Sequence, residues 1–471
     1  MAAPNQSAEP RRPAPWLLPT VLVLICLVVT SWALGLLESN RELAQQQGSS
    51  TSLSVPSSVS DKLEVKGQID QVALRQELTE ASEDFVNGNL SALVVEADTG
   101  QTLFAQDADK PRIPASNFKA LTDYALLRTV DPDTVFSTSV KLAEKNLTLV
   151  AGGDSLLVPG ESQPDKVVGR AGLKTLAQET IQALKDRPEK NYRLNLDTSM
   201  YSGPNTNPAW DPADISAGFV GPISPLAFYS HYSPSQDGSA STSRPSNAAQ
   251  EVQDYLVSEL KELGSAYGIT VSLGSNQKAA AQAQTIAEVT SASAAEQSAY
   301  MMQQSDNMLA EVLGRNAAYA ASGQGSFLKA KELIEQTLAK DAIPSQGLKI
   351  VDLCGLSQEN RVTNTTLVAL TRAIVTGQNG MDRALPGLPV AGTGGTLASR
   401  FTRQDQYPAL GYTRAKTGTL NSVISLTGYT TSRSGQVLVF SLVCNDVTDT
   451  QAAKDTVDRI AAILTQAGGS S

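Results

Sequence analysis

Three short polar motifs constrain this chain more than any other feature of its sequence. They are Ser-Asn-Phe-Lys at 116–119, Ser-Asp-Asn at 305–307 and Lys-Thr-Gly-Thr at 416–419. A fold that brings them together places a serine hydroxyl beside a lysine amine, the pairing that acyl transfer through a covalent serine intermediate requires. The motifs therefore predict a Ser/Lys acyl-transfer site.

The first motif needs its context, because Ser-x-x-Lys also occurs at 275–278 and 326–329. Ser116 follows Pro114-Ala115 and opens an apolar run at helical spacing, so we expect it at a helix N-terminus. Free backbone N–H groups there favour negative charge beside the hydroxyl, and the i+3 side chain of Lys119 lies on the same face. We predict Ser116 as the nucleophile and interpret the other two serines as structural, as an isolated Ser-x-x-Lys usually is.

Proton transfer sets a requirement on the lysines. A lysine with an ordinary pKa is protonated at neutral pH, so Lys119 can act as a base only if burial or a second cation lowers its pKa, and Lys416 could be that cation. Ser305 is predicted at an exposed junction between two helical stretches and could pass a proton to a leaving amine, while the Asn307 amide could hold a peptide group. Taken alone, the second motif would be interpreted as helix capping.

The third motif is expected on the first strand of a sheet. Two segments rich in Val, Leu, Phe and Tyr follow it, at 423–429 and 437–444. Gly418 would let a ligand approach the backbone, and the hydroxyls of Thr417 and Thr419 could bind a carboxylate. The N–H of Thr419 could pair with that of Ser116 as an oxyanion hole. A plain strand end is the alternative.

Several other mechanisms lack the residues they need. The chain has one histidine, His231, whose neighbours predict an exposed loop, so neither a multi-histidine metal site nor a Ser-His-Asp triad is expected. No nucleotide-binding fingerprint occurs. The net charge is −10 without a Lys/Arg-rich block, which argues against a nucleic-acid partner.

The N-terminus predicts export. Arg11-Arg12 precede an uncharged stretch over 16–37, long enough to span a bilayer with residues 1–15 inside as a cytoplasmic tail. A cleaved signal peptide with its site near 31–33 is the alternative. A Ser/Gln-rich stalk over 38–70 would follow. Cys354 and Cys444, the cysteines beyond this region, are expected as two buried thiols rather than a disulfide.

The 471 residues are enough for two or three domains. We expect a hairpin from 92–96 and 101–104, a helix over 248–263 and a C-terminal amphipathic helix over 451–467. The distance between the first two motifs is too long for a loop and predicts an insert. The predicted domains are a first catalytic part at 71–140, an inserted domain at 141–285 and a second catalytic part at 286–471.

Together these features resemble the low-molecular-mass penicillin-binding proteins of the D-alanyl-D-alanine carboxypeptidase and endopeptidase type, the S13-like serine peptidases with a large insertion after Ser-x-x-K. Further segments carry the likeness, among them Gly152-Gly153-Asp154, Gly221-Pro222-Ile223, Gly355-Leu356-Ser357 and Gly395-Thr396-Leu397. Two features depart from the family: Leu353-Cys354 stands where Gly-Ser is usual, and the insertion looks shorter than in its larger members.

The resemblance implies a multidomain α/β protein with the penicilloyl-serine-transferase (β-lactamase-like) fold, an antiparallel sheet flanked by helices and a mostly β insert. It implies hydrolysis of peptidoglycan stem peptides or cross-links and covalent binding of β-lactams, without a metal or cofactor. Ser116 would be the nucleophile and Lys119 the base. Ser305 and Lys416 would return the proton, Asn307 would orient the peptide, and Thr417, Gly418 and Thr419 would bind substrate.

Three alternatives stay open at this stage. A class A-like β-lactamase shares the motifs but is compact and uses a dedicated glutamate for deacylation. A non-catalytic cell-wall-binding module and a Ser/Lys amidase of unrelated fold are the others. The favoured location is the cell membrane, with the catalytic body on the extracytoplasmic side.

Overall fold

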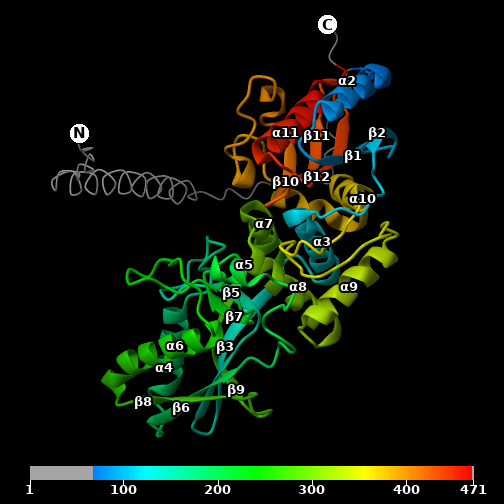
Figure 1. The fold of residues 1–471 in the computed structure, drawn as a ribbon. Helices are drawn as coiled ribbons and strands as arrows, with labels where there is room; N and C mark the ends of the chain where they lie inside the picture. The colour runs from blue at the N-terminus through cyan, green and yellow to red at the C-terminus, as the bar shows by residue number, and fades with distance from the viewer. Residues whose placement is uncertain (1–66, 469–471) are drawn as a thin grey trace, which may run out of the picture. The chain divides into compact units, whose positions relative to one another are not determined.

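The central element of the fold is a five-stranded antiparallel sheet in the order β10-β11-β12-β1-β2 (Figure 1). The structure is a computed structural model and describes residues 67–468. The strands of this sheet are β1 (Asn89–Glu96), β2 (Thr102–Gln106), β10 (Arg414–Leu420), β11 (Val423–Thr431) and β12 (Val437–Asn445). The predicted hairpin is confirmed, as is the position of the third motif on the first of three consecutive strands.

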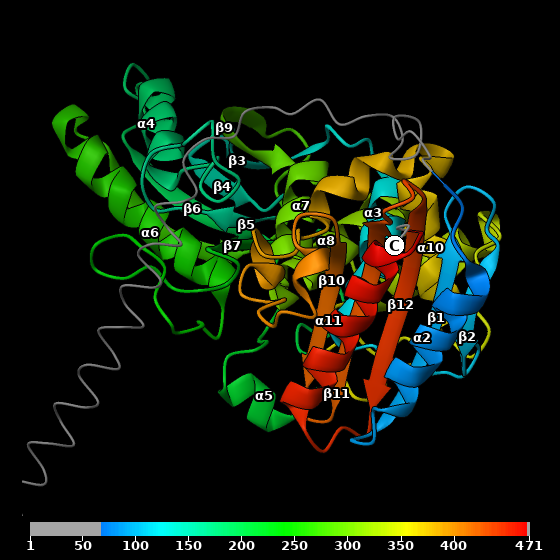
Figure 2. The same cartoon turned by 90° about the horizontal axis from the view of Figure 1, so that it is seen from above.

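This sheet is buried on both faces, as its sequence pattern requires. In β1, Ala92 and Val94 contribute to one hydrophobic core while Leu93 and Val95 contribute to another, because successive side chains of a strand point to opposite faces. Helices α2 (Gln71–Glu83) and α11 (Thr450–Gln466) lie side by side over one face (Figure 2). The predicted C-terminal helix is thereby confirmed.

The opposite face packs on a helical layer that carries two of the motifs. Its helices are η2 (Ala115–Phe118), α3 (Lys119–Thr129), α7 (Ala294–Gln304), α8 (Asn307–Ser322), α9 (Phe327–Lys340), α10 (Asn364–Val375) and η4 (Gln378–Gly387). Helix α10 contacts β1, β11 and β12, and α3 contacts α7, α8 and α9. Leu121, Leu309, Leu313 and Leu367 belong to the core between these elements. Three short turns, η3 (Ser265–Tyr267), η5 (Gly395–Leu397) and η6 (Tyr407–Ala409), complete the 3-10 helices of the described chain.

A second five-stranded sheet, in the order β8-β6-β4-β3-β9, forms between the first two motifs. Its strands are β3 (Val135–Ala143), β4 (Asn146–Val150), β6 (Asn191–Asp197), β8 (Thr270–Asn276) and β9 (Gln284–Ser293). β3 and β9 extend across the predicted boundaries of the insert at 141 and 285. Helices α4 (Leu173–Leu184) and α6 (Ala248–Gly264) pack with this sheet around a core of their own, so the expectation of a mostly β insert understates its helical content. The helix predicted over 248–263 is confirmed.

Smaller elements connect this sheet to the helical layer. β5 (Asp154–Leu157) and β7 (Leu226–Phe228) form a parallel pair, and α5 (Pro212–Ser216) is a short helix. Within residues 67–468, no helix is long and apolar enough to cross a membrane. The predicted tail, membrane anchor and most of the stalk lie outside the described residues.

Candidate active site

The backbone around Ser116 is shaped by close approaches. Ser116 lies in the 3-10 turn η2, which leads directly into α3, so the prediction of a helix start is confirmed. Ala115 before it has a positive φ of 50°. A Cβ on Gly355 would lie 2.0 Å from the Ala115 carbonyl oxygen, and one on Gly418 would lie 2.8 Å from the Pro114 carbonyl oxygen. Glycine at both positions therefore lets two other chain segments press against the residues before the serine.

Lys119 has three acceptors around its amine. Its Nζ lies 3.0 Å from Ser116 Oγ, 2.7 Å from Asn307 Oδ1 and 2.7 Å from the Cys354 carbonyl oxygen. An ammonium can donate to all three. A neutral amine has two N–H groups and one lone pair, and neither an amide oxygen nor a carbonyl can donate to it, so only the Ser116 hydroxyl can face the lone pair. In the neutral state the geometry suits Lys119 to accept the Ser116 proton.

Burial favours that neutral state. Lys119 and Lys416 are both buried, 0% and 1% exposed. Burial lowers the pKa of Lys119 below the ordinary lysine value, although the carboxylates of Asp352, Asp306 and Glu311 oppose the shift. Burial also lowers the pKa of Lys416, and there the positive charge of Lys119 adds to the effect. Of the two predicted causes, burial and the charge of Lys416, burial is the largest cause of the lowered pKa of Lys119.

The second motif forms the junction between α7 and α8. Ser305 ends α7 with a positive φ of 58°, and Asp306 caps α8 by accepting from Leu309 N. Ser305 is partly exposed, and its Oγ accepts from Lys416 Nζ at 2.8 Å. The sharp turn at Ser305 and the helix start at Asn307 thus aim two neighbouring side chains at two different lysines.

The third motif lies on β10, at the edge of the sheet. Lys416 Nζ also donates to the Thr417 carbonyl at 2.9 Å, and Thr417 Oγ1 donates to Thr396 Oγ1 at 2.8 Å. Thr419 is exposed. Next to Gly418, the space that a side chain would take is occupied by Ser425 Oγ as well as by Pro114.

A cavity of about 500 Å³ opens beside Ser116. Residues far apart in the sequence line this cavity, among them Ser116, Asn307, Thr419, Leu356, Gln358, Asp214 and Phe219. The predicted residues Ser116, Asn307 and Thr419 thus share one cavity. The sequence analysis missed Asp214, on the short helix α5, and Phe219, just after that helix, because neither belongs to a motif. It also missed the Cys354 carbonyl, because a backbone atom has no signature in the sequence.

The other residues that the sequence analysis considered for a catalytic role do not line the cavity beside Ser116. Ser326 is the N-cap of α9 and accepts from Lys329 N, and Ser275 lies on β8, so the structural interpretation of both is supported. The prediction that His231 lies in an exposed loop was wrong. This residue is 2% exposed, and its Nε2 accepts a hydrogen bond from Ser224 N at 2.9 Å. Packing of its segment against the rest of the fold, which local sequence does not reveal, buries it.

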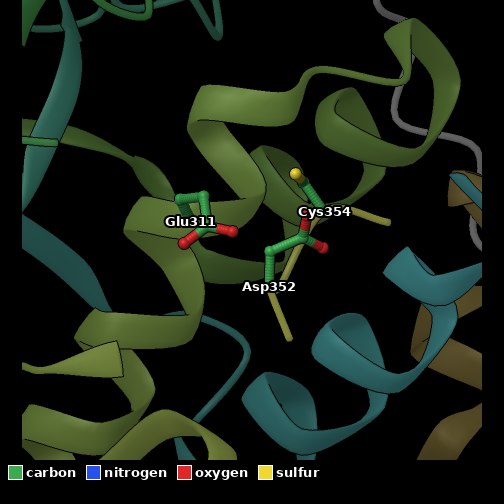
Figure 3. Close-up of side chains that lie close together, drawn as sticks. All are labelled: Glu311, Asp352 and Cys354. Atoms are coloured by element: carbon green, nitrogen blue, oxygen red, sulfur yellow. The ribbon is translucent and has the colours of Figure 1, made fainter. Parts of the chain in front are cut away.

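Cys354 and Cys444 are buried free thiols, as expected. Cys354 lies with Glu311 and Asp352 in a buried group of ligand-type side chains whose candidate ligand atoms are all within 4.8 Å of one another (Figure 3). The two carboxylates are already occupied by protein donors. Glu311 accepts from Leu353 N and Arg315 Nη1, and Asp352 accepts from four donors. Burial raises the pKa of the Cys354 thiol, so the group fits a structural network better than a metal site.

Comparisons with known proteins agree with this geometry. The sequence pattern of the D-Ala-D-Ala carboxypeptidase 3 (S13) family matches residues 74–243 and 233–467. Carboxypeptidase DacB of Mycolicibacterium smegmatis is 34% identical over 388 residues, which cover 81% of each chain. Carboxypeptidase Rv3627c of Mycobacterium tuberculosis is 34% identical over 370 residues, 76% of this chain and 77% of that one.

Among solved structures, penicillin binding protein 4 (dacB) of Haemophilus influenzae has the same fold. It superposes with a TM-score of 0.64 at 19% identity and covers 84% of this chain and 98% of its own. The penicilloyl-serine-transferase fold class predicted from sequence is thereby confirmed. By its sequence pattern and its relatives, this chain belongs to the D-Ala-D-Ala carboxypeptidase 3 (S13) family.

Proposed function

We propose that this protein is a serine-type D-Ala-D-Ala carboxypeptidase or endopeptidase that hydrolyses peptidoglycan stem peptides through an acyl-Ser116 intermediate. The observation that carries the proposal is the 3.0 Å contact between Lys119 Nζ and Ser116 Oγ, made by a fully buried lysine with a lowered pKa. Family membership and relatives named carboxypeptidases support it. Penicillin binding protein 4 of Haemophilus influenzae has been crystallised with a β-lactam, in line with β-lactams as covalent inhibitors.

Each motif has a role in the proposed reaction. Lys119 takes the Ser116 proton as Oγ attacks the carbonyl between two D-alanines, and the backbone N–H groups of Ser116 and Thr419 receive the developing oxyanion. Lys416 donates a proton to Ser305, and Ser305 passes its own hydroxyl proton to the leaving amine. Water then attacks the acyl carbonyl and its proton passes to Lys416, while Lys119 returns the proton to Ser116 Oγ as the acyl–Oγ bond breaks, which restores the starting state.

The remaining site residues bind substrate. The Asn307 amide has a second N–H besides the one that donates to the Phe219 carbonyl at 3.1 Å, and that N–H orients the peptide. When substrate binds, the Thr417 hydroxyl turns from Thr396 Oγ1 to the terminal carboxylate, which it holds together with Thr419. Gly418 contributes by letting β10 lie against the segment before Ser116.

Covalent labelling tests the proposal. The protein is incubated with a labelled penicillin, digested, and the adduct is located by mass spectrometry, with Ser116→Ala as the control. We expect the adduct on Ser116 alone. Labelling of Ser275 or Ser326, or unchanged labelling of Ser116→Ala, contradicts the assignment.

The remaining parts of the proposal concern the location of the protein in the cell and its division into domains. We infer that residues 16–37 anchor the protein in the membrane, with the catalytic body on the extracytoplasmic side, where peptidoglycan is found. The supporting features are the uncharged length of this segment and the arginines that precede it. We also propose that the insert predicted at 141–285, extended to include the whole of β3 and β9, interrupts a catalytic domain made of the segments before and after it.

A further inference from the structure

The Cys354 carbonyl oxygen is one of two atoms that can aim the lone pair of Lys119. In its neutral form the amine donates to Asn307 Oδ1 and to Cys354 O, both at 2.7 Å, and this leaves the lone pair toward Ser116. A displacement of Cys354 O would let the amine rotate away from the hydroxyl. The position of this backbone atom therefore matters for proton transfer.

The backbone on both sides of Cys354 is fixed by buried side chains. Leu353 N donates to Glu311 Oε1 at 2.7 Å, and the Leu353 carbonyl accepts from Thr122 Oγ1 at 2.6 Å. After Cys354, Gly355 N and Ser357 N donate to the Asp352 carboxylate at 2.7 and 2.6 Å. The backbone of segment 352–357 is thus hydrogen-bonded to the side chain of its first residue, Asp352.

Asp352 is fully buried, and its oxygens are saturated. Oδ1 accepts from Gly355 N and from Asn360 Nδ2 at 2.8 Å, and Oδ2 accepts from Ser357 N and from Trp210 Nε1 at 3.1 Å. Four donors match the capacity of a carboxylate, so each is needed to hold the charge without water.

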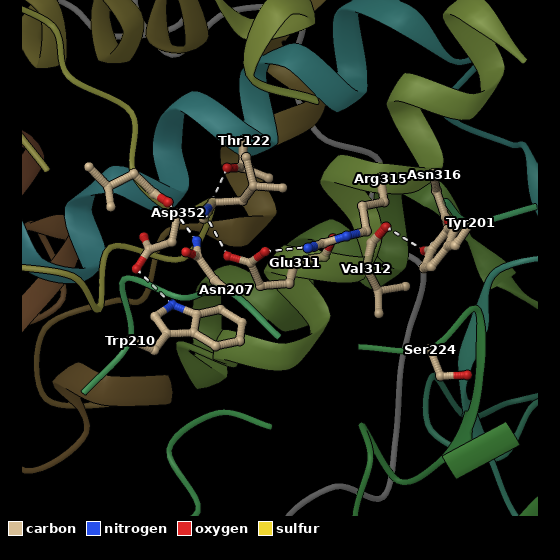
Figure 4. Close-up of polar contacts among 12 residues, drawn as sticks. Thr122, Tyr201, Asn207, Trp210, Ser224, Glu311, Val312, Arg315, Asn316 and Asp352 are labelled. Atoms are coloured by element: carbon tan, nitrogen blue, oxygen red, sulfur yellow. Dashed lines mark hydrogen bonds and ion pairs between the residues drawn. The ribbon is translucent and has the colours of Figure 1, made fainter. Parts of the chain in front are cut away.

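Two of the contacts that hold this segment come from the predicted insert. Trp210, 4% exposed, reaches Asp352, and Asn207 Nδ2 donates to the Val351 carbonyl at 2.6 Å. Figure 4 shows both side chains directed at the segment beside Glu311 and Thr122. Tyr201, another residue of the insert, makes a part-buried contact with α8, where its single hydroxyl hydrogen can be donated to Asn316 Oδ1 at 2.6 Å or to the Val312 carbonyl at 3.0 Å.

We propose that Asp352, Trp210 and Asn207 are positioning residues for the acylation of Ser116, through which the insert holds the Cys354 carbonyl against Lys119. The inference rests on the proposed function, since it assigns the base role to Lys119. None of the three needs to touch substrate. Their effect should fall on the rate of the chemical step and not on binding.

The test separates binding from acylation in the full-length protein. A chromogenic β-lactam is mixed with enzyme at increasing concentrations, and stopped-flow traces yield the dissociation constant and the limiting acylation rate. Trp210→Phe keeps an aromatic ring and removes the Nε1 donor together with part of the buried indole volume. We expect the limiting rate to fall about tenfold with an unchanged dissociation constant, as small misplacements of a catalytic group cause.

Tyr201→Phe is the control for loss of a hydrogen-bond donor of the insert, because this hydroxyl contacts α8 and does not reach segment 352–357. It should change the limiting rate by less than about twofold. Equal losses in Trp210→Phe and Tyr201→Phe would show a general weakening of the fold and overturn the proposal, as would an unchanged rate in Trp210→Phe.

Asn207→Ala covers the case in which Trp210→Phe does not fold. It should lower the limiting rate while the dissociation constant stays constant, and an unchanged rate overturns the proposal. The wild-type traces keep the two hypotheses apart. If wild type is not acylated at Ser116, the proposed function fails, whereas normal wild-type acylation with unaffected variants refutes only the positioning role.

Discussion

Burial lowers the pKa of Lys119 and of His231, as it does that of Lys416, but Lys119 and His231 differ in what the shift does. In the proposed reaction this shift serves the chemistry, because only the neutral amine of Lys119 can accept the Ser116 proton. His231 has no place in the proposed reaction, and its neutral ring accepts from the Ser224 backbone. The same physical cause therefore has a functional consequence at one residue and a stability consequence at the other.

Lys119→Arg should abolish most acylation. Arginine keeps the charge but does not deprotonate, so we expect the acylation rate by β-lactam to fall at least about 100-fold, the effect of removing a general base. Lys329→Arg, at the exposed lysine of another Ser-x-x-Lys, is the control and should be silent. A normal rate in Lys119→Arg would leave Lys119 only a structural role.

The acylation rate of the wild type should decrease toward acid pH. Because burial lowers the pKa of Lys119, its amine stays neutral to a lower pH than an exposed lysine would, and the rate falls as pH drops through that value. Stopped-flow acylation between pH 5 and 9 measures the profile. A rate that rises toward acid pH would contradict a neutral Lys119 base.

His231 should make folding stability depend on pH. Its pKa is lowered to about 3 by burial and by the charges of Arg244 and Arg315, against an ordinary value of 6.5. Between these values the unfolded chain binds a proton that the folded chain does not, so stability falls as pH falls from 6.5 toward 3. Between pH 7 and 5, wild type should lose about 2 kcal/mol relative to His231→Gln.

Urea unfolding of both proteins at pH 7 and pH 5 measures this difference. The comparison is clean because the chain has one histidine, and the buried carboxyl groups that titrate in the same range are common to both proteins. A difference that stays constant with pH would mean that the folded and unfolded chains take up the same number of protons at His231, which would contradict its lowered pKa.

At the scale of single elements, helix α8 links the cavity beside Ser116 to the segment around Leu353 that holds the Cys354 carbonyl. Asn307 begins the helix at the cavity, Glu311 one turn later binds Leu353 N, and Arg315 one turn further pairs with Glu311 at 2.6 Å. Gly314 lies opposite the Leu353 side chain. The Leu353 that departs from the family pattern thus packs where α8 has no side chain.

Gly314→Ala should be destabilising despite the better helix propensity of alanine. The new Cβ would lie 2.7 Å from Leu353 Cδ1, and Leu353 is fully buried and cannot turn into solvent. Overpacking of this kind costs about 1–3 kcal/mol, more than the roughly 1 kcal/mol that replacing a helical glycine contributes.

A double-mutant cycle checks the cause. In a Leu353→Ala background the clash is absent, so Gly314→Ala should become neutral or stabilising in thermal or urea unfolding. The same sign of effect in both backgrounds would mean that Leu353 is not the residue that requires glycine at 314.

For the whole molecule, the predicted arrangement is a membrane-tethered enzyme. Every motif lies within residues 67–468, while the uncharged segment 16–37 precedes them. A shortened protein that begins at Gly67 should therefore be soluble and release D-alanine from a D-alanyl-D-alanine peptide, whereas full-length protein should sediment with membranes.

Two outcomes would revise this arrangement differently. A mature protein that begins at Leu34 in the native host would refute the anchor and leave the enzyme intact. Fast turnover of penicillin without release of D-alanine would instead favour the β-lactamase alternative.

Local chemistry determined much of this protein from sequence alone. The helix start at Ser116 and the strand that carries Lys416 follow from the periodicity of nearby apolar residues and from proline and glycine positions. The side chains with a proposed role in the reaction at Ser116 belong to the three motifs. They could be identified from sequence because an acyl-transfer site needs particular functional groups, and short polar motifs contain them.

Tertiary structure decided what depends on contacts between distant segments. The burial of His231, the carbonyl of Cys354 beside Lys119 and the reach of Trp210 to Asp352 leave no local pattern. A backbone oxygen has the same identity in every residue, and burial is a property of what packs against a side chain. Only the folded chain could therefore show how the base is oriented and what holds it in place.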